Sequence, residues 1–154
     1  MDRETDDDLG LKLQKVLTRY VDSKDGYTHA AEIISNKTLA AIFLEIAENR
    51  AAIIPRLAKI MEAHGQEPQA VGSVEGSVHR WWMSIRDELA KDELKNLLIE
   101  CIRGESALLE ALDESIQFGK LLDEDMRAIE MVRVDVEKAV SHFTAAVHDK
   151  EFVD

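Results

Sequence analysis

Apolar residues recur at intervals of three and four along four long stretches of the chain, which is the pattern of an amphipathic helix. The stretches cover residues 8–34, 39–64, 92–118 and 123 onward, with apolar positions such as Leu13, Val16 and Tyr20 in the first. Each is long enough for several helical turns, and no alternating strand pattern competes with them. The periodicity therefore predicts an all-α protein.

Residues that commonly begin or end helices mark the bounds of these predicted helices. Gly65 follows the second stretch directly and is a natural stop, because glycine adopts the left-handed conformation that closes many helices. Asp123 precedes the fourth stretch and is expected to be its N-cap. Pro55 lies inside the second stretch on the side away from the apolar stripe, where we expect an outward-facing kink.

The lengths of the connections constrain the topology. Short links join the first helix to the second and the third to the fourth, so each pair is expected to form an antiparallel hairpin. The middle connection, 65–91, is long and holds a short predicted helix over 77–90. One long crossover between two hairpins is the ferritin-like arrangement of a four-helix bundle. We expect an acidic tail over 1–7 and a single domain over 8–150.

The composition of the chain limits its possible partners and its cellular location. The formal net charge of −12 repels phosphate backbones and anionic lipid surfaces, so the sequence predicts no binding to nucleic acid or to membranes. The N-terminal residues lack the apolar core of a secretory signal, and no apolar run reaches the ~20 residues of a membrane span. A single cysteine, Cys101, has no internal disulfide partner. The expected location is the cytoplasm.

Four segments resemble, in their order, a bacterial family of ferritin-like four-helix bundles catalogued as a domain of unknown function. They are DGYTHAAE, ENRAAIIPRL, GSVEGSVHRWW and ECIRGESALLEAL. The resemblance extends from Leu17 to Asp149. It implies a ferritin-like fold in a bacterial cytoplasm, and it brings no activity with it.

A ferritin-like fold raises the question of a di-iron site, and DGYTHAAE offers His29 and Glu32 as ligands. Such a site needs a Glu from each of two helices and a Glu-x-x-His from each of the other two, all pointing inward. At about 100° per residue, both His29 and Glu32 fall opposite the inward-facing Tyr27. The pattern favours a solvated surface for these two residues.

The polar residues that point inward form a different set. They include Arg50 on the second helix, Cys101 and Glu105 on the third, and Arg133 at the edge of the stripe on the fourth. Ser23 and Lys24 are inward candidates on the first helix. Two guanidinium groups would repel a divalent cation, so the sequence predicts no metal ion but a buried layer of Arg50, Glu105, Arg133 and Cys101. The sequence shows no Gly-rich phosphate loop, nucleophile motif or metal-ligand spacing, so it predicts no cofactor and no catalytic residue.

Cys101 itself has two interpretations. It is a reactive thiol if a nearby arginine lowers its pKa, but no inward histidine is available as its base. The favoured interpretation is a small buried filler.

The HRWW segment is the other conspicuous feature. Val78, Trp81, Trp82 and Ile85 share one face of the short crossover helix. We expect this face to pack on the bundle as a lid, and a dimer or ligand contact is the alternative.

These observations favour a non-enzymatic helical bundle that acts through surface or dimer contacts, with a homodimer as the candidate assembly. The alternative is a divergent metal-binding or redox protein that uses Glu105 and a neighbouring carboxylate such as Glu137. Protection of DNA by a ferritin-like shell conflicts with the acidic surface.

Overall fold

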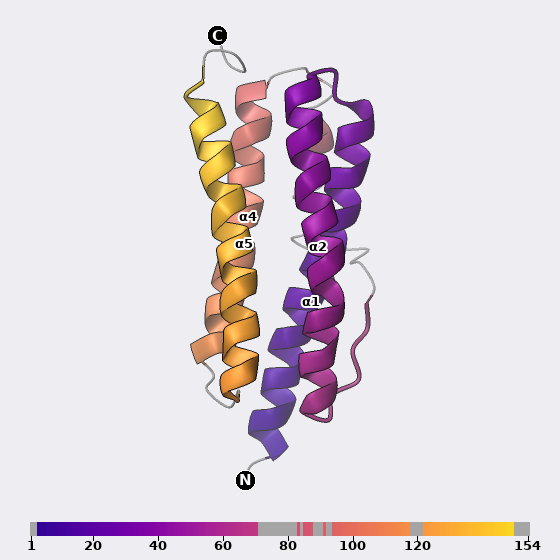
Figure 1. The fold of residues 1–154 in the computed structure, drawn as a ribbon, viewed down its shortest axis with the longest axis vertical. Coiled ribbons are helices and arrows are strands. Elements are labelled where there is room, and N and C mark those ends of the chain that lie inside the picture. The colour runs from indigo at the N-terminus through magenta and orange to yellow at the C-terminus, as the bar shows by residue number, and fades with distance from the viewer. Residues whose placement is uncertain are drawn as a thin grey trace.

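The computed structural model describes residues 3–70, 83, 85–87, 91, 94–117 and 122–149. These residues form long helices that lie side by side, and they contain no strand (Figure 1). The all-α prediction is confirmed. The long helices are α1 (Arg3–Ile33), α2 (Lys37–Ala63), α4 (Leu94–Gln117) and α5 (Asp123–Val147).

The helices pack as two hairpins. α1 packs along α2, α4 packs along α5, and the hairpins meet through α1 with α4 and through α2 with α5. Within the described helices, neither diagonal pair, α1 with α5 or α2 with α4, makes backbone contact. In Figure 1, α1 and α5 run upward whereas α2 and α4 run downward, so α2 ends and α4 begins at opposite ends of the molecule.

Local signals account for the helix ends. The Asn36 side chain caps α2 by accepting a hydrogen bond from the Leu39 N–H at 3.0 Å. At the other end, Gly65 has a φ of 75° and the Gln66 N–H donates to the Met61 carbonyl at 2.9 Å. This is a Schellman motif, in which the left-handed residue is most easily glycine. The predicted stop at Gly65 is confirmed.

The predicted N-cap of α5 is wrong by one residue. Leu122 occupies that position, and Asp123 is already helical. Asp125 completes the cap, because its Oδ2 accepts a hydrogen bond from the Leu122 N–H at 3.2 Å. A carboxylate in the first turn also suits the positive end of the helix dipole. The shift is within the ordinary uncertainty of a helix boundary.

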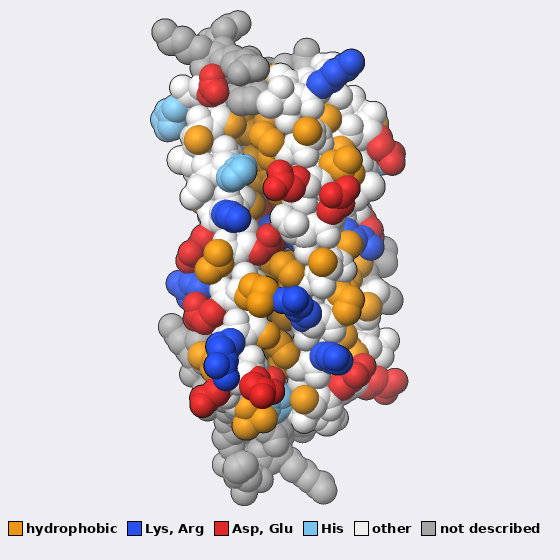
Figure 2. Space-filling view, viewed as in Figure 1, with side chains coloured by type: hydrophobic (Ala, Val, Ile, Leu, Met, Phe, Trp, Pro, Cys, Tyr) orange, Lys and Arg blue, Asp and Glu red, His pale blue; other side chains and the backbone are white. Residues whose placement is uncertain are grey.

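The face formed by α2 and α5 carries both charged and hydrophobic side chains. Figure 2 shows acidic and basic side chains along the face formed by α2 and α5, with hydrophobic side chains between them. Pro55 is exposed, and α2 continues through it. In the part of the chain that the structure describes, no helix has both the length and the apolar character that a membrane span requires.

The core is divided into two hydrophobic clusters along the length of the bundle. One cluster includes Leu13, Leu57 and Leu112, and the other includes Phe43, Leu98 and Phe143. Between them lie buried charged side chains, among them Arg50 and Glu105. Three aromatic rings of the second cluster pack on one another, with centroids 5.5–6.0 Å apart, and they are Tyr27, Phe43 and Phe143.

Candidate functional site

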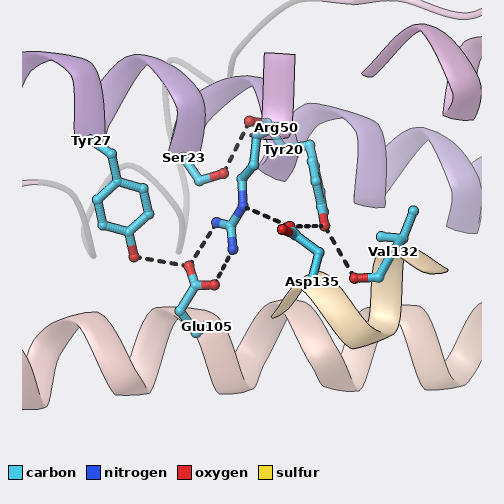
Figure 3. Close-up of polar contacts among 7 residues, drawn as sticks. All are labelled: Tyr20, Ser23, Tyr27, Arg50, Glu105, Val132 and Asp135. Atoms are coloured by element: carbon cyan, nitrogen blue, oxygen red, sulfur yellow. Dashed lines mark hydrogen bonds and ion pairs between the residues drawn. The ribbon is translucent and has the colours of Figure 1, made fainter. Parts of the chain in front are cut away.

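An ion pair crosses the centre of the molecule from α2 to α4 (Figure 3). Arg50 is 0% exposed and Glu105 is 1% exposed. The Arg50 Nη1 donates to Glu105 Oε2 at 2.7 Å, and Nη2 donates to Oε1, so the contact is bidentate. Because α2 and α4 are a diagonal pair without backbone contact, only long side chains can join them.

Two tyrosines of α1 enclose the guanidinium. The Arg50 Cζ lies 5.1 Å from the ring centroid of Tyr20 and 5.6 Å from that of Tyr27, which is the range of a cation–π contact. The Tyr27 hydroxyl also donates to Glu105 Oε2 at 2.9 Å. Tyr20 and Tyr27 are two helical turns apart, so both rings lie on the same side of α1.

A second carboxylate, Asp135 of α5, completes the layer. The Tyr20 hydroxyl donates to Asp135 Oδ2 at 3.1 Å and lies 3.4 Å from the Val132 carbonyl oxygen. This contact joins the other diagonal pair, α1 and α5. The Arg50 Nε lies 3.6 Å from the same Asp135 oxygen, which makes an ion pair without a hydrogen bond. Ser23 is buried nearby and donates to the Tyr20 carbonyl at 3.0 Å.

Burial and charge set the ionisation of these groups. Burial raises the pKa of both tyrosines well above 10.0, and the carboxylate beside each adds to the effect. Burial also raises the pKa of Asp135, although Arg50 opposes that shift. Burial lowers the pKa of the Arg50 guanidinium, but Glu105 and the two tyrosines together raise it by more. The raised pKa values keep both phenols neutral, beside a guanidinium that remains charged.

Cys101 lies one turn from Glu105 and is 0% exposed. Burial raises the pKa of its thiol, and Glu105 raises it further, whereas the lowering effect of Arg50 is smaller. The proximity of an arginine therefore does not activate this thiol. In this structure Cys101 packs as a small apolar side chain of the core.

The predicted place of Arg133 in the buried layer is wrong. Its side chain is 33% exposed, and it pairs with Asp113 of α4 and with Glu137 one turn along α5. Arg133 lies at the surface because it is at the edge of the apolar stripe of α5, on the side that faces α4, where the Asp113 carboxylate is within reach. Glu137, the second carboxylate of the metal-binding alternative, is 49% exposed in the same cluster, whereas Glu105 is 1% exposed.

The remaining predicted residues lie apart from the layer. His29 and Glu32 are 54% and 69% exposed, with 4.0 Å between His29 Nδ1 and Glu32 Oε2. Lys24 is half-buried and pairs with Asp25 rather than with the core. Of the HRWW face, Ile85 is buried in the hydrophobic core, and Val78, Trp81 and Trp82 lie outside the described residues.

The donor set does not suit the di-metal centre of a ferritin-like bundle. The two buried carboxylates, Glu105 and Asp135, face the Arg50 guanidinium, which takes the position between them. Among the described residues, no three His, Cys, Asp or Glu side chains come together in a way that could hold a metal ion. A divalent cation at this position would face a fixed positive charge.

Asp135 and the polar roles of the two tyrosines are not among the features that the sequence predicts. A signal for Asp135 was present, because Val132 and Ala139, three residues before and four after it, are both buried. Periodicity places Tyr20 and Tyr27 in the apolar stripe of α1, and their rings lie there. Their hydroxyls reach carboxylates on other helices, which the stripe alone does not reveal.

Comparison with known proteins gives one relationship. A family model described as a domain of unknown function (DUF2383) matches residues 8–117. The matched range holds Tyr20, Tyr27, Arg50 and Glu105, and it ends before Asp135. No curated protein and no solved structure matches the chain. The match covers well over half of the sequence, so this protein belongs to the family described as a domain of unknown function, DUF2383.

Proposed function

We propose that this protein is a ferritin-like four-helix bundle that acts by binding rather than by catalysis. In this proposal an internal ion-pair layer stands where metal-loading bundles of that class carry their two metal ions. The order and direction of the helices support the ferritin-like assignment. Two antiparallel hairpins joined by one long crossover are the arrangement that distinguishes this class of bundle.

The observation that carries the proposal is the position of Arg50. Its guanidinium donates two hydrogen bonds to Glu105 and lies 3.6 Å from Asp135 at the middle of the bundle. An arginine remains charged at any physiological pH, so it is a permanent substitute for a cation. The carboxylate oxygens that face this guanidinium are already paired with it, so they are not free to bind a metal ion at its position.

The layer has a structural task that fits a binding protein. It links both diagonals of the bundle, through Arg50 with Glu105 and through Tyr20 with Asp135. Buried ion pairs contribute little net stability compared with apolar packing, but they penalise any arrangement that leaves one partner alone. We propose that the layer fixes the register of the two hairpins and leaves the outer faces for function.

A protein of this kind would act through contacts at its surface. Several large apolar side chains are exposed among the described residues, including Leu44 at 46%, Met131 at 49% and Val134 at 53%. A homodimer in the bacterial cytoplasm is our proposed assembly. The solution mass, measured by sedimentation equilibrium over a wide concentration range, tests it directly, and a monomer at all concentrations would contradict it.

Metal content tests the central proposal. Protein purified from its host, without chelators, should contain far less than one iron, manganese or zinc atom per chain by elemental analysis. An Arg133→Met variant is the matched control, because it removes a surface arginine and leaves the layer intact. Two metal atoms per chain in the unmodified protein would overturn the proposal, as would metal loss specific to a Glu105→Gln variant.

A further inference from the structure

A small groove lies between α2 and α5, on the face seen in Figure 2, with a volume of about 60 Å³. From α2 it is lined by residues spaced three and four apart, so one continuous stripe of the helix faces it. These residues are Ile42, Glu45, Ile46 and Asn49. The matching stripe of α5 runs in the opposite direction and consists of Asp135, Lys138, Ala139 and His142.

The groove has an apolar floor and an acidic end. Ile46 and Ala139 are buried, and together with Ile42 they form the floor. Asn49 and Asp135 lie at the same end, because α2 and α5 are antiparallel. The groove is therefore amphipathic along its length.

The rim side chains are available for a ligand. Glu45 and Asn49 of α2 and Lys138 and His142 of α5 are exposed, and none of them forms a hydrogen bond or ion pair with another described residue. Their charges nearly cancel, since one is acidic and one is basic. The acidic character of the groove comes from Asp135.

Asp135 connects the groove to the buried layer. Its side chain is 15% exposed, and its Oδ2 faces the Tyr20 hydroxyl at 3.1 Å and the Arg50 Nε at 3.6 Å. Its other oxygen, Oδ1, has no hydrogen-bond donor among the described residues. One carboxylate oxygen is thus held in place from inside, and the other is left for the groove.

We infer that this groove binds a small aliphatic amine. The ammonium group would donate to Asp135 Oδ1, with Asn49 and Glu45 as further acceptors, and the alkyl chain would lie on Ile46, Ala139 and Ile42. A cavity of ~150 Å³ holds benzene, so a groove of this size takes an ammonium head and about two carbons, with a longer chain extending along the open side. The net charge of −12 attracts cations and repels anions.

The inference deepens the proposed binding role and rests on it, but its test is separate from metal content. Butylamine, butanol and butanoate share one alkyl chain and differ in the charge of the head group. Titration of each into isotopically labelled protein, followed by amide NMR shifts, should give saturable changes along α2 and α5 for butylamine. Butanol and butanoate should bind at least tenfold more weakly. Equal binding of butanol would overturn the inference, because the floor alone would then explain it.

Two surface variants separate the groove from the overall acidic field. Asn49→Lys places a positive charge beside Asp135 and should weaken butylamine binding at least tenfold. Ala51→Lys adds the same charge about 200° around α2, at an exposed position outside the groove, and should change the affinity less than twofold. A similar loss of butylamine affinity in both variants would show that binding depends only on the net charge of the protein, which would contradict the inference.

Asp135→Asn provides an independent test that keeps the shape of the side chain. Its folded state is first verified by circular dichroism, and butylamine binding should fall at least tenfold. Unchanged affinity in this variant would refute the role of Asp135. A lysine side chain carries the same ammonium on an alkyl chain, so Nα-acetyl-lysine methylamide is titrated alongside butylamine. Tighter binding of the lysine derivative would assign the source of the amine to a protein, and tighter binding of butylamine to a free metabolite.

Discussion

Removal of Glu105 is the most informative perturbation of the buried layer. Its two carboxylate oxygens accept three hydrogen bonds, two from the Arg50 guanidinium and one from the Tyr27 hydroxyl. All three residues are essentially inaccessible to solvent. In Glu105→Ala, the guanidinium loses both of these hydrogen bonds and keeps only its 3.6 Å contact with Asp135 and the faces of the Tyr20 and Tyr27 rings.

The magnitude follows from the cost of an unpaired buried charge. Breaking a buried ion pair by removing one partner destabilises a protein by about 3–5 kcal/mol. For a chain of this size, each kcal/mol lowers the melting temperature by roughly 2–4 °C. We therefore expect Glu105→Ala to melt roughly 6–20 °C below the unmodified protein. This loss is a large share of the ~5–15 kcal/mol by which a domain is stable.

Urea denaturation followed by circular dichroism measures the effect, and two variants serve as controls. Glu32→Ala removes a carboxylate that is 69% exposed, and it should change the free energy of unfolding by about 0.5 kcal/mol or less. The double variant Arg50→Leu/Glu105→Leu removes both charges, so it should be markedly more stable than Glu105→Ala. A double-mutant cycle with the single variants Arg50→Leu and Glu105→Leu isolates the coupling between the two residues.

Equal free energies of unfolding for Glu105→Ala and Glu32→Ala would refute the reasoning, since both carboxylates would then behave as surface groups. A double variant no more stable than Glu105→Ala would also contradict it. In that case removal of the unpaired guanidinium would not restore stability, so the unpaired charge would not be the cause of the loss.

Three further predictions concern other parts of the structure. Tyr20 and Tyr27 are the only tyrosines in the chain, and burial raises the pKa of both above 10.0. A phenol whose folded-state pKa is raised stabilises the fold fully below its unfolded value and loses this contribution as pH rises, so stability should fall above about pH 10. Tyrosinate absorbance should appear only together with unfolding, and its appearance in the folded protein would contradict this assignment. Cys101 should not react with a thiol reagent until the protein unfolds, because its thiol is buried and the pKa of that thiol is raised. Rapid labelling of the native protein would show that the thiol is accessible and would contradict this prediction. The His64 ring lies 2.7 Å from Asp125 Oδ2, and this contact joins the end of α2 to the start of α5. His64→Ala removes the contact and should lower the free energy of unfolding, measured by urea denaturation, by about 1 kcal/mol. An unchanged free energy of unfolding would mean that the contact contributes nothing to stability.

The sequence by itself determined the features that depend on neighbouring residues. Helix periodicity gave the all-α class, and Gly65 marked the end of α2 through its left-handed backbone. The inward directions of Arg50 and Glu105 also followed from the sequence. Both lie near the centre of an apolar stripe, where a rotation of about 100° per residue leaves little ambiguity.

The tertiary structure decided what happens at the edges of the stripes. Arg133 and Asp135 are two residues apart on α5, yet Arg133 turns to Asp113 at the surface and Asp135 turns to Arg50 in the layer. A residue at an edge is buried or exposed according to the tilt and register of the neighbouring helix, which periodicity within one helix does not contain. The groove beside Asp135 has the same origin, because it exists only through the pairing of α2 with α5.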